Sequence, residues 1–170
     1  MIDERMRTEI NKQINAELYS AYLYLSMATY FEDQGLPGFA NWMYCQNQEE
    51  TFHGMKFLHY LVERGGRVDL LAIDEPPREW ASPLAVLEHV YEHEQHVTSL
   101  INNLVDIAEE IKDRATFNEL QWFVEEQVEE EASAETLVTK LRMIKDTPGP
   151  LLMIDNELAT RVFTPPDASE

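Results

Sequence analysis

The sequence is poor in cysteine and in positive charge, and it contains no long apolar run. A single cysteine, Cys45, cannot form an internal disulfide, which excludes a secreted disulfide framework and a cysteine-rich metal site. Only 13 Lys and Arg residues oppose 32 Asp and Glu residues, and the net charge of −19 disfavours nucleic acid and anionic membranes while attracting cations. No segment has the roughly 18 apolar residues of a membrane span, and the N-terminus lacks the apolar stretch of a signal peptide. We therefore expect a soluble cytoplasmic protein with no nucleic acid and no membrane as partner.

The length and the apolar content are those of one folded domain. The chain has 170 residues, of which 44% are hydrophobic, so it can bury a core without disulfides. The acidity therefore belongs to a folded protein and not to a disordered acidic chain. We expect a single domain over residues 1–163, followed by a polar tail over residues 164–170.

Proline and, apart from Gly54, glycine gather at a few points that divide the chain into helices. Residues 84–147 contain neither, and one straight helix of that length would be about 96 Å long at 1.5 Å per residue. This stretch must therefore fold back, most simply near Lys112–Arg114. Short connections give antiparallel pairs, whereas the long connection between the second and third helices can cross the bundle from end to end. The predicted helices lie at residues 3–33, 38–64, 83–111, 114–146 and 151–162.

Each of the four long predicted helices carries a seam of mostly apolar residues at alternating spacings of three and four, as expected for a bundle core. Polar or ionisable residues interrupt every seam near the middle of its helix. Because the midpoints of four packed helices lie at one level, we expect these side chains to converge inside the bundle. The interrupting residues are Glu17 on the first helix, Glu50 and His53 on the second, Glu94 on the third, and Gln127 and Glu130 on the fourth.

Converging carboxylates need protons or a metal ion, since a buried unpaired charge is strongly unfavourable. The seams offer no Lys or Arg as a counterion, which favours a metal. Several carboxylates with one imidazole and no thiolate suit iron or manganese, with zinc as a competitor. One such glutamate could be a satisfied core residue, but four helices interrupted at one level favour a metal site.

These interrupting residues, together with four long helices and a short fifth one, resemble the non-haem ferritins of bacteria and archaea. The resemblance covers nearly the whole chain and carries little only after Phe163. It implies an all-α, ferritin-like four-helix bundle with a long crossover between the second and third helices and a short fifth, C-terminal helix. The stretches that carry it include Tyr19–Tyr24, Tyr91–Glu94 and Gln121–Glu131.

The resemblance implies iron storage with ferroxidase activity. A protein of this kind oxidises Fe(II) to Fe(III) at a di-iron carboxylate centre inside the bundle, with O2 or H2O2 as the oxidant. It stores the product as ferric oxyhydroxide mineral inside a hollow homo-oligomer, which the resemblance implies to have 24 subunits. Iron is thus the implied metal.

The resemblance also assigns ligands to the two irons. The first iron is assigned to Glu17, Glu50 and His53. The second is assigned to Glu50, Glu94 and Glu130, so that Glu50 bridges the two ions.

Further residues are assigned around this pair. Gln127 is implied to line the site through a water or a hydrogen bond. Tyr24, one heptad from Glu17, is implied to lie beside the di-iron centre, where it supplies an electron or a hydrogen bond; a core tyrosine with a satisfied hydroxyl is an equal alternative. A third iron site is implied beside the pair, alongside Glu130, with the ligands Glu49, Glu126 and Glu129.

Departures from related families narrow the prediction. A bacterioferritin-like centre would need a second Glu-x-x-His on the fourth helix, where this chain has Gln127-x-x-Glu130. In the resembled family, the methionine that binds haem lies just before the histidine of the second helix. This chain has Thr51 and Phe52 there. We therefore expect no haem.

Two alternatives remain open at this stage. A non-catalytic acidic helical bundle that acts as an interaction protein would carry protonated or hydrated carboxylates in the same seams. An oxygenase or a manganese enzyme on the same bundle is compatible with the seams but not with the fifth helix.

Three histidines of the third predicted helix, His89, His93 and His96, share one helix face and could bind a transition metal. They lie off the core seam, so solvated or interface histidines are the favoured interpretation.

Overall fold

Five helices account for most of the chain in the computed structural model, which describes residues 1–145 and 147–166. These residues contain no strand, so the predicted all-α class is confirmed. None of the helices in this part of the chain is both long enough and apolar enough to cross a membrane. The helices are α1 (Glu4–Asp33), α2 (Pro37–Glu63), α3 (Pro83–Glu110), α4 (Arg114–Ile144) and α5 (Pro148–Leu158).

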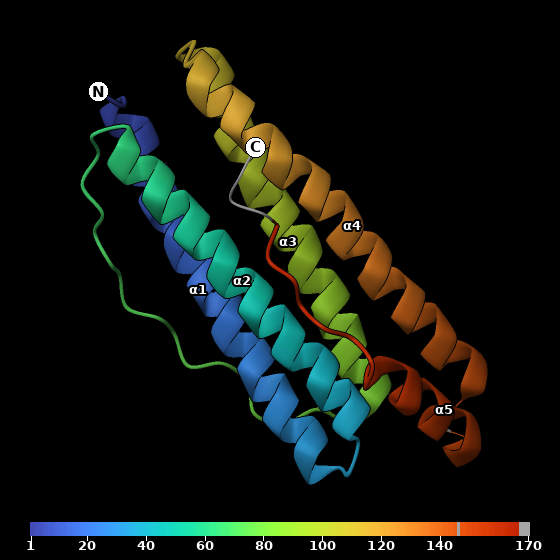
Figure 1. The fold of residues 1–170 in the computed structure, drawn as a ribbon. Coiled ribbons are helices and arrows are strands. Elements are labelled where there is room, and N and C mark those ends of the chain that lie inside the picture. Colours follow the sequence, from blue (N-terminus) through green and yellow to red (C-terminus); the bar gives the residue numbers. More distant parts are fainter. Residues whose placement is uncertain (146, 167–170) are drawn as a thin grey trace.

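The four long helices lie side by side as a bundle (Figure 1). A short turn joins α1 to α2, and another joins α3 to α4, so each pair is antiparallel. Residues 64–82 form the crossover, which runs the length of the bundle from the end of α2 to the start of α3 (Figure 1). Consequently α2 and α3 are parallel, and the topology predicted from the connection lengths is confirmed.

Three helices begin at residues whose side chains satisfy the free N–H groups of the first turn. The Asp3 carboxylate accepts from the second and third N–H groups of α1. Ser82 does the same at the start of α3, where its hydroxyl accepts a 3.1 Å hydrogen bond, and Asp113 caps α4 with a 3.2 Å bond. Side chains of this kind stabilise the first turn of a helix by accepting hydrogen bonds from its free N–H groups.

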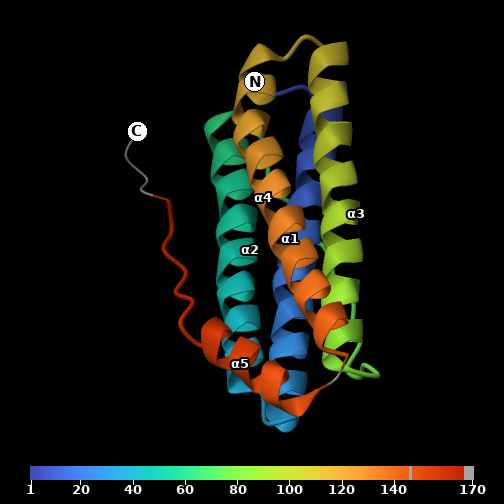
Figure 2. The ribbon, with the colours of Figure 1, turned by 90° about the vertical axis from the view of Figure 1, so that its right-hand side faces the viewer.

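The start of α2 has no local side-chain cap, because Leu36 occupies the capping position. The buried Asp155 of α5 takes that role, and its Oδ1 accepts hydrogen bonds from the backbone N–H groups of Gly38 (2.8 Å) and Phe39 (2.9 Å). The two helices approach so closely that a Cβ on Gly38 would lie 1.7 Å from the Asp155 carbonyl oxygen. This contact holds α5 across the end of the bundle (Figure 2).

The fifth helix lies earlier in the chain than predicted. It begins at Pro148 instead of residue 151, because proline is tolerated in the first turn of a helix, and it ends at Leu158 instead of residue 162. The fourth helix ends at Ile144, since Lys145 adopts a left-handed conformation with φ 45°. The predicted end of that helix, residue 146, lies outside the described residues, as do residues 167–170 of the predicted tail.

Asparagine side chains of α1 fasten the crossover to the bundle. Asn11 donates to the Arg67 carbonyl oxygen (3.1 Å) and accepts from the Asp69 N–H (2.7 Å). One turn further on, Asn15 donates to the Ala72 carbonyl oxygen (3.1 Å). The crossover therefore follows α1 because its backbone finds hydrogen-bond partners there.

The core consists of two apolar clusters at opposite ends of the bundle. One includes Phe31 and Phe39 near the α1–α2 turn, and the other includes Ile10, Phe57 and Phe123 towards the opposite end. On every long helix, the polar residues that interrupt the seam lie in the sequence between members of the two clusters. The bundle is thus apolar at both ends and polar at the middle level.

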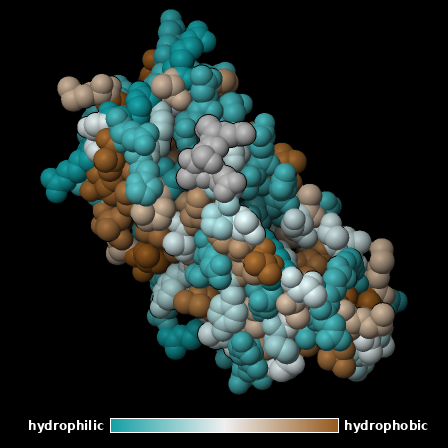
Figure 3. Space-filling model, in the orientation of Figure 1, coloured by the Kyte–Doolittle hydropathy of each residue, from teal (hydrophilic) through white to brown (hydrophobic). Residues whose placement is uncertain are grey.

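Much of the surface is hydrophilic on the face drawn in Figure 3, in keeping with the acidic composition. Hydrophobic residues gather on the side where the crossover runs. The crossover exposes three large aliphatic side chains, Leu70 (71%), Leu71 (50%) and Ile73 (43%). Exposed apolar patches of this kind are typical of surfaces that contact another chain.

Candidate metal centre

Four helices contribute carboxylates to the polar level of the bundle. Glu17 of α1, Glu50 of α2 and Glu94 of α3 each expose 1% of their surface, and Glu130 of α4 exposes 6%. One ligand atom from each of Glu17, Glu50 and His53 lies within 4.8 Å of the other two, which is compatible with a shared metal ion. We call Glu17, Glu50, His53, Glu94 and Glu130 the inner group.

The remaining carboxylates of the inner group face Glu50 closely enough to change its protonation. Burial raises the pKa of Glu50 well above its usual range, and the negative charges of Glu94, Glu17 and Glu130 raise it further. Burial likewise raises the pKa of Glu130, with Glu94 as the next cause. Without a cation the inner group must therefore retain protons near neutral pH.

Glu94 has hydrogen-bond donors that partly oppose the effect of burial. Burial raises its pKa to about 7, although hydrogen bonds from the Tyr24 hydroxyl and from Gln127 favour the ionised form. The Gln127 amide lies 3.3 Å from Glu94 Oε2. Tyr24 is fully buried and its own pKa is raised well above the usual value, first by burial and then by Glu94, so it remains a neutral donor.

Several carboxylate oxygens of the inner group have no hydrogen-bond partner among the described residues. They are Glu17 Oε2 and both oxygens of Glu50. A buried carboxylate oxygen without a donor is costly, and a bound cation would satisfy all three. The donor set of carboxylates and one imidazole therefore fits a hard or borderline metal ion such as iron.

Two glutamines that were not predicted as site residues orient these carboxylates. Gln13 donates to Glu17 Oε1, and Gln46 donates to Glu130 Oε2, each at 2.8 Å. Both glutamines are buried. Their spacing could have identified them as residues that face the site. Gln13 lies one turn before Glu17, and Gln46 lies one turn before Glu50, so each shares a helix face with a predicted ligand.

His53 lies between the inner group and a second set of carboxylates. Its Nδ1 is 3.6 Å from Glu50 Oε2, whereas its Nε2 is 4.0 Å from Glu126 Oε2. Burial lowers the pKa of His53, so the imidazole is neutral near pH 7 and has a lone pair available for a metal. The rings of Trp122 and Phe123 lie nearly perpendicular to the imidazole, at centroid distances of 5.5 and 6.1 Å.

The second set lies beside the inner group and is less buried. One ligand atom from each of Glu49, His53 and Glu126 lies within 4.8 Å of the others. Burial raises the pKa of Glu126, and the charges of Glu49 and Glu129 raise it further. Glu129 itself is exposed and is not brought into this set. We call Glu49, Glu126 and Glu129 the outer group.

The outer group also has a cationic neighbour that was not predicted. Arg161, which follows α5, places Nη2 2.7 Å from Glu49 Oε2. The predicted fifth helix, residues 151–162, included this residue, whereas α5 ends at Leu158, so the contact could not be predicted from the sequence.

Two of the three histidines of α3, His89 and His93, are held by polar neighbours of other kinds. His93 Nε2 lies 2.8 Å from the Ser20 hydroxyl, and His89 Nδ1 accepts a 3.0 Å hydrogen bond from Trp80. Burial lowers the pKa of His93 to about 4, so this side chain is neutral at pH 7. His96 is exposed. No metal-binding set among the described residues includes any of the three.

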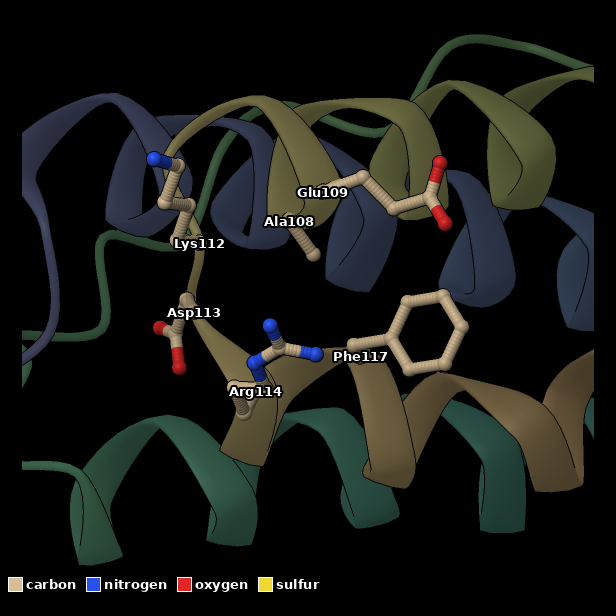
Figure 4. Close-up of a pocket in the computed structure, with 6 residues that line it drawn as sticks. All are labelled: Ala108, Glu109, Lys112, Asp113, Arg114 and Phe117. Atoms are coloured by element: carbon tan, nitrogen blue, oxygen red, sulfur yellow. The ribbon is translucent and has the colours of Figure 1, made fainter.

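A separate pocket at the turn between α3 and α4 is unrelated to these carboxylates (Figure 4). None of the predicted iron ligands lines it. Its lining residues are Ala108, Glu109, Lys112, Asp113, Arg114 and Phe117.

A four-helix bundle that encloses carboxylates and an imidazole contributed by facing helices defines a class of metal-binding bundles. The family model described as a ferritin-like domain matches residues 7–144. The chain therefore belongs to the ferritin family, and the resemblance to prokaryotic non-haem ferritins predicted from the sequence is confirmed.

Individual relatives support this assignment over nearly the full length. The bacterial non-heme ferritin of Bacteroides fragilis is 47% identical over 161 residues, which cover 95% of this chain and 100% of the relative. That of Staphylococcus saprophyticus is 40% identical, covering 96% and 98%. The open pore ferritin of the archaeon Archaeoglobus fulgidus is 58% identical, with a TM-score of 0.95 over 95% of this chain and 100% of that one.

Proposed function

We propose that this protein stores iron and oxidises Fe(II) to Fe(III) at the inner group. The observation that carries the proposal is the set of buried carboxylate oxygens on Glu17 and Glu50 that have no hydrogen-bond partner among the described residues. Membership of the ferritin family and the names of the relatives, which are non-heme ferritins, support iron as the cation.

Two ions are proposed as substrates of the inner group. Glu17, Glu50 and His53 would bind the first, and Glu50, Glu94 and Glu130 the second, with Glu50 shared between them. Binding of the positive ions replaces the protons that burial otherwise retains on the carboxyl groups, so metal uptake releases protons. The carboxylates then favour the ferric product, which is the harder Lewis acid.

The oxidant is proposed to be O2 or H2O2. Each Fe(II) loses one electron, so a pair of ions supplies the two electrons that convert O2 and two protons to H2O2, or H2O2 and two protons to water. Tyr24 is proposed to hold Glu94 through its hydroxyl and to be available as an additional one-electron donor. Gln127 would keep Glu94 oriented from the opposite side.

The outer group is proposed as a third iron site. Glu49 and Glu126 would provide carboxylates beside His53, and Glu129 would join them by turning its exposed side chain inward, alongside Glu130. Because these carboxylates are less buried than the inner group, iron there should exchange more readily with its surroundings.

Storage requires an enclosed space, which a single chain of this shape does not provide. We propose that copies of this chain assemble into a hollow shell of 24 subunits, in the cytoplasm, with ferric oxyhydroxide inside. The exposed aliphatic residues of the crossover, Leu70, Leu71 and Ile73, support association with further copies.

The test is aerobic addition of Fe(II) to the metal-free protein, followed by the rise of ferric absorbance. The double variant Glu50→Ala with His53→Ala removes the shared ligand and the imidazole. Oxidation should slow by about 100-fold or more, because losing a residue that only hydrogen-bonds to a metal ligand already lowers metal affinity or activity by about 10- to 100-fold. A matched control on the same helix is His59→Ala with Glu63→Ala, which changes two exposed side chains. Equal rates in the two double variants would contradict the inner group as the site of oxidation.

A further inference from the structure

The segment that follows α5 turns back along α2 (Figures 1 and 2). Asn41 of α2 donates to the carbonyl oxygens of Leu158 (3.1 Å) and Arg161 (3.0 Å). Further along, the rings of Phe163 and Phe52 lie 6.3 Å apart. These contacts fix the path of the segment, so the position of the Arg161 side chain is determined by the fold.

The guanidinium of Arg161 is held on two sides. Its Cζ lies 4.9 Å from the centroid of the Trp42 ring, and its Nη1 lies 3.5 Å from the Trp42 carbonyl oxygen. Its Nη2 forms the 2.7 Å ion pair with Glu49. Both partners of that ion pair are partly shielded from water, with side-chain exposures of 28% and 18%. Stacking on an aromatic face and shielding strengthen such a contact relative to an open surface pair.

Arg161 distinguishes the outer group from the inner group. Within the described residues, it is the one Lys or Arg that forms an ion pair with any proposed iron ligand. In the part of the chain that the structure describes, the inner carboxylates have amide and hydroxyl donors but form no ion pair with Lys or Arg, and Arg161 acts on them only through its more distant charge, which lowers the pKa of Glu130. A metal ion at Glu49 would share its carboxylate with a fixed positive charge, and like charges at this range repel.

We propose that Arg161 is a built-in counterion of the outer group that competes with metal ions for Glu49. It thereby lowers the affinity of the outer group for iron more than that of the inner group, and it satisfies Glu49 when no metal is bound. The inference rests on the proposed function of the outer group as a third iron site. It makes Arg161 a residue that sets the relative affinity of the two groups.

The experiment is an anaerobic calorimetric titration of the assembled, metal-free protein with Fe(II). Arg161→Gln should tighten the outer event by about two- to fivefold, the range expected for loss of a partly exposed ion pair, and should change the inner binding events less. Arg161→Lys retains the charge and should remain close to the wild type. Arg142→Gln breaks the exposed ion pair of Arg142 with Glu88 and makes the same change in net charge away from the site. It therefore controls for the effect of net charge on Fe(II) binding.

The Glu49→Gln variant separates the possible outcomes. In that background Arg161→Gln should have no effect, because the shared carboxylate is absent. Unchanged or weaker outer binding in Arg161→Gln alone would overturn the inference, and weaker binding would mean that Arg161 positions Glu49 for the metal. Absence of Fe(II) binding by the wild type would instead contradict the proposed function, and the inference with it. Circular dichroism and shell size verify that each variant is folded.

Discussion

The inner and outer groups lie side by side and are built from the same kinds of residue, yet they differ in burial and in partners. Glu50 is 1% exposed, and neither of its oxygens has a hydrogen-bond partner among the described residues. Its neighbour in the chain, Glu49, is only partly buried and forms an ion pair with Arg161. One step along a helix rotates a side chain by about 100°, and that rotation separates a carboxylate that requires a cation from one that already has one.

This difference explains how one bundle could bind iron in two ways. Carboxylates in a water-poor interior interact strongly with a metal ion and with each other, whereas partly exposed carboxylates are screened by water and salt. The inner group is therefore suited to hold two ions in place for oxidation. The outer group is suited to a weaker and more readily exchanged ion.

The largest effect that should separate the two groups is the pH dependence of the metal-free protein. The pKa of Glu94 is raised from 4.5 to about 7 by burial, so the folded protein retains a proton that the unfolded chain releases. The resulting stabilisation is fully present below about pH 4.5 and is lost as the pH rises through about 7, a change of roughly 3 kcal/mol. Thermal melts from pH 4.5 to 8 in the presence of a chelator should show this loss.

Glu94→Gln is the variant that isolates this contribution. It retains the shape of the side chain but cannot titrate, so its stability should change less with pH than that of the wild type. Glu92→Gln, at an exposed position on the same helix, should follow the wild type. Parallel pH profiles for the wild type and Glu94→Gln would contradict the raised pKa.

A smaller effect is expected from Asp155→Ala, which loosens the connection that brings Arg161 to the outer group. The change removes both hydrogen bonds to the start of α2, at Gly38 and Phe39, and should cost about 1–3 kcal/mol. We expect a lower melting temperature and tighter outer-site binding of Fe(II), with inner-site oxidation retained. Asn156→Ala, at the exposed next position, is the matched control. Loss of inner-site oxidation with unchanged outer-site binding would contradict this prediction, because it would mean that Asp155 supports the inner group and not the outer group.

The smallest effect is expected from Glu129→Gln. Glu129 is exposed and must turn inward to reach an ion, whereas Glu126 already lies with Glu49 and His53. Outer-site affinity for Fe(II) should fall by about two- to threefold in Glu129→Gln, within the range of exposed charge interactions, and by more in Glu126→Gln. An equal or larger fall in Glu129→Gln would show that both carboxylates bind the ion to a similar extent.

The features of the fold that follow a periodic residue pattern were predictable from the sequence. Seams with alternating spacings of three and four identified four long helices, and the interruptions at Glu17, Glu50, Glu94 and Glu130 indicated a buried polar level. The positions of proline and glycine indicated where the helices begin and end. These features depend on neighbours within one or two turns, which a single sequence displays directly.

The parts that depend on distant contacts were not predictable. The start of α2 is capped by Asp155, a residue more than a hundred positions away, and α5 begins at Pro148, before the predicted start at residue 151. The ion pair between Arg161 and Glu49 joins a non-helical segment to a helix, with no repeat to reveal it. Such contacts follow from the packing of the whole chain.

The inner group is proposed to bind two iron ions inside the bundle. Anomalous diffraction at the iron edge, from crystals soaked in Fe(II) without oxygen, would locate these ions. We expect one peak among Glu17, Glu50 and His53 and another among Glu50, Glu94 and Glu130, with a weaker third peak beside Glu49. Iron peaks confined to the outer surface, with none between these side chains, would contradict this proposal.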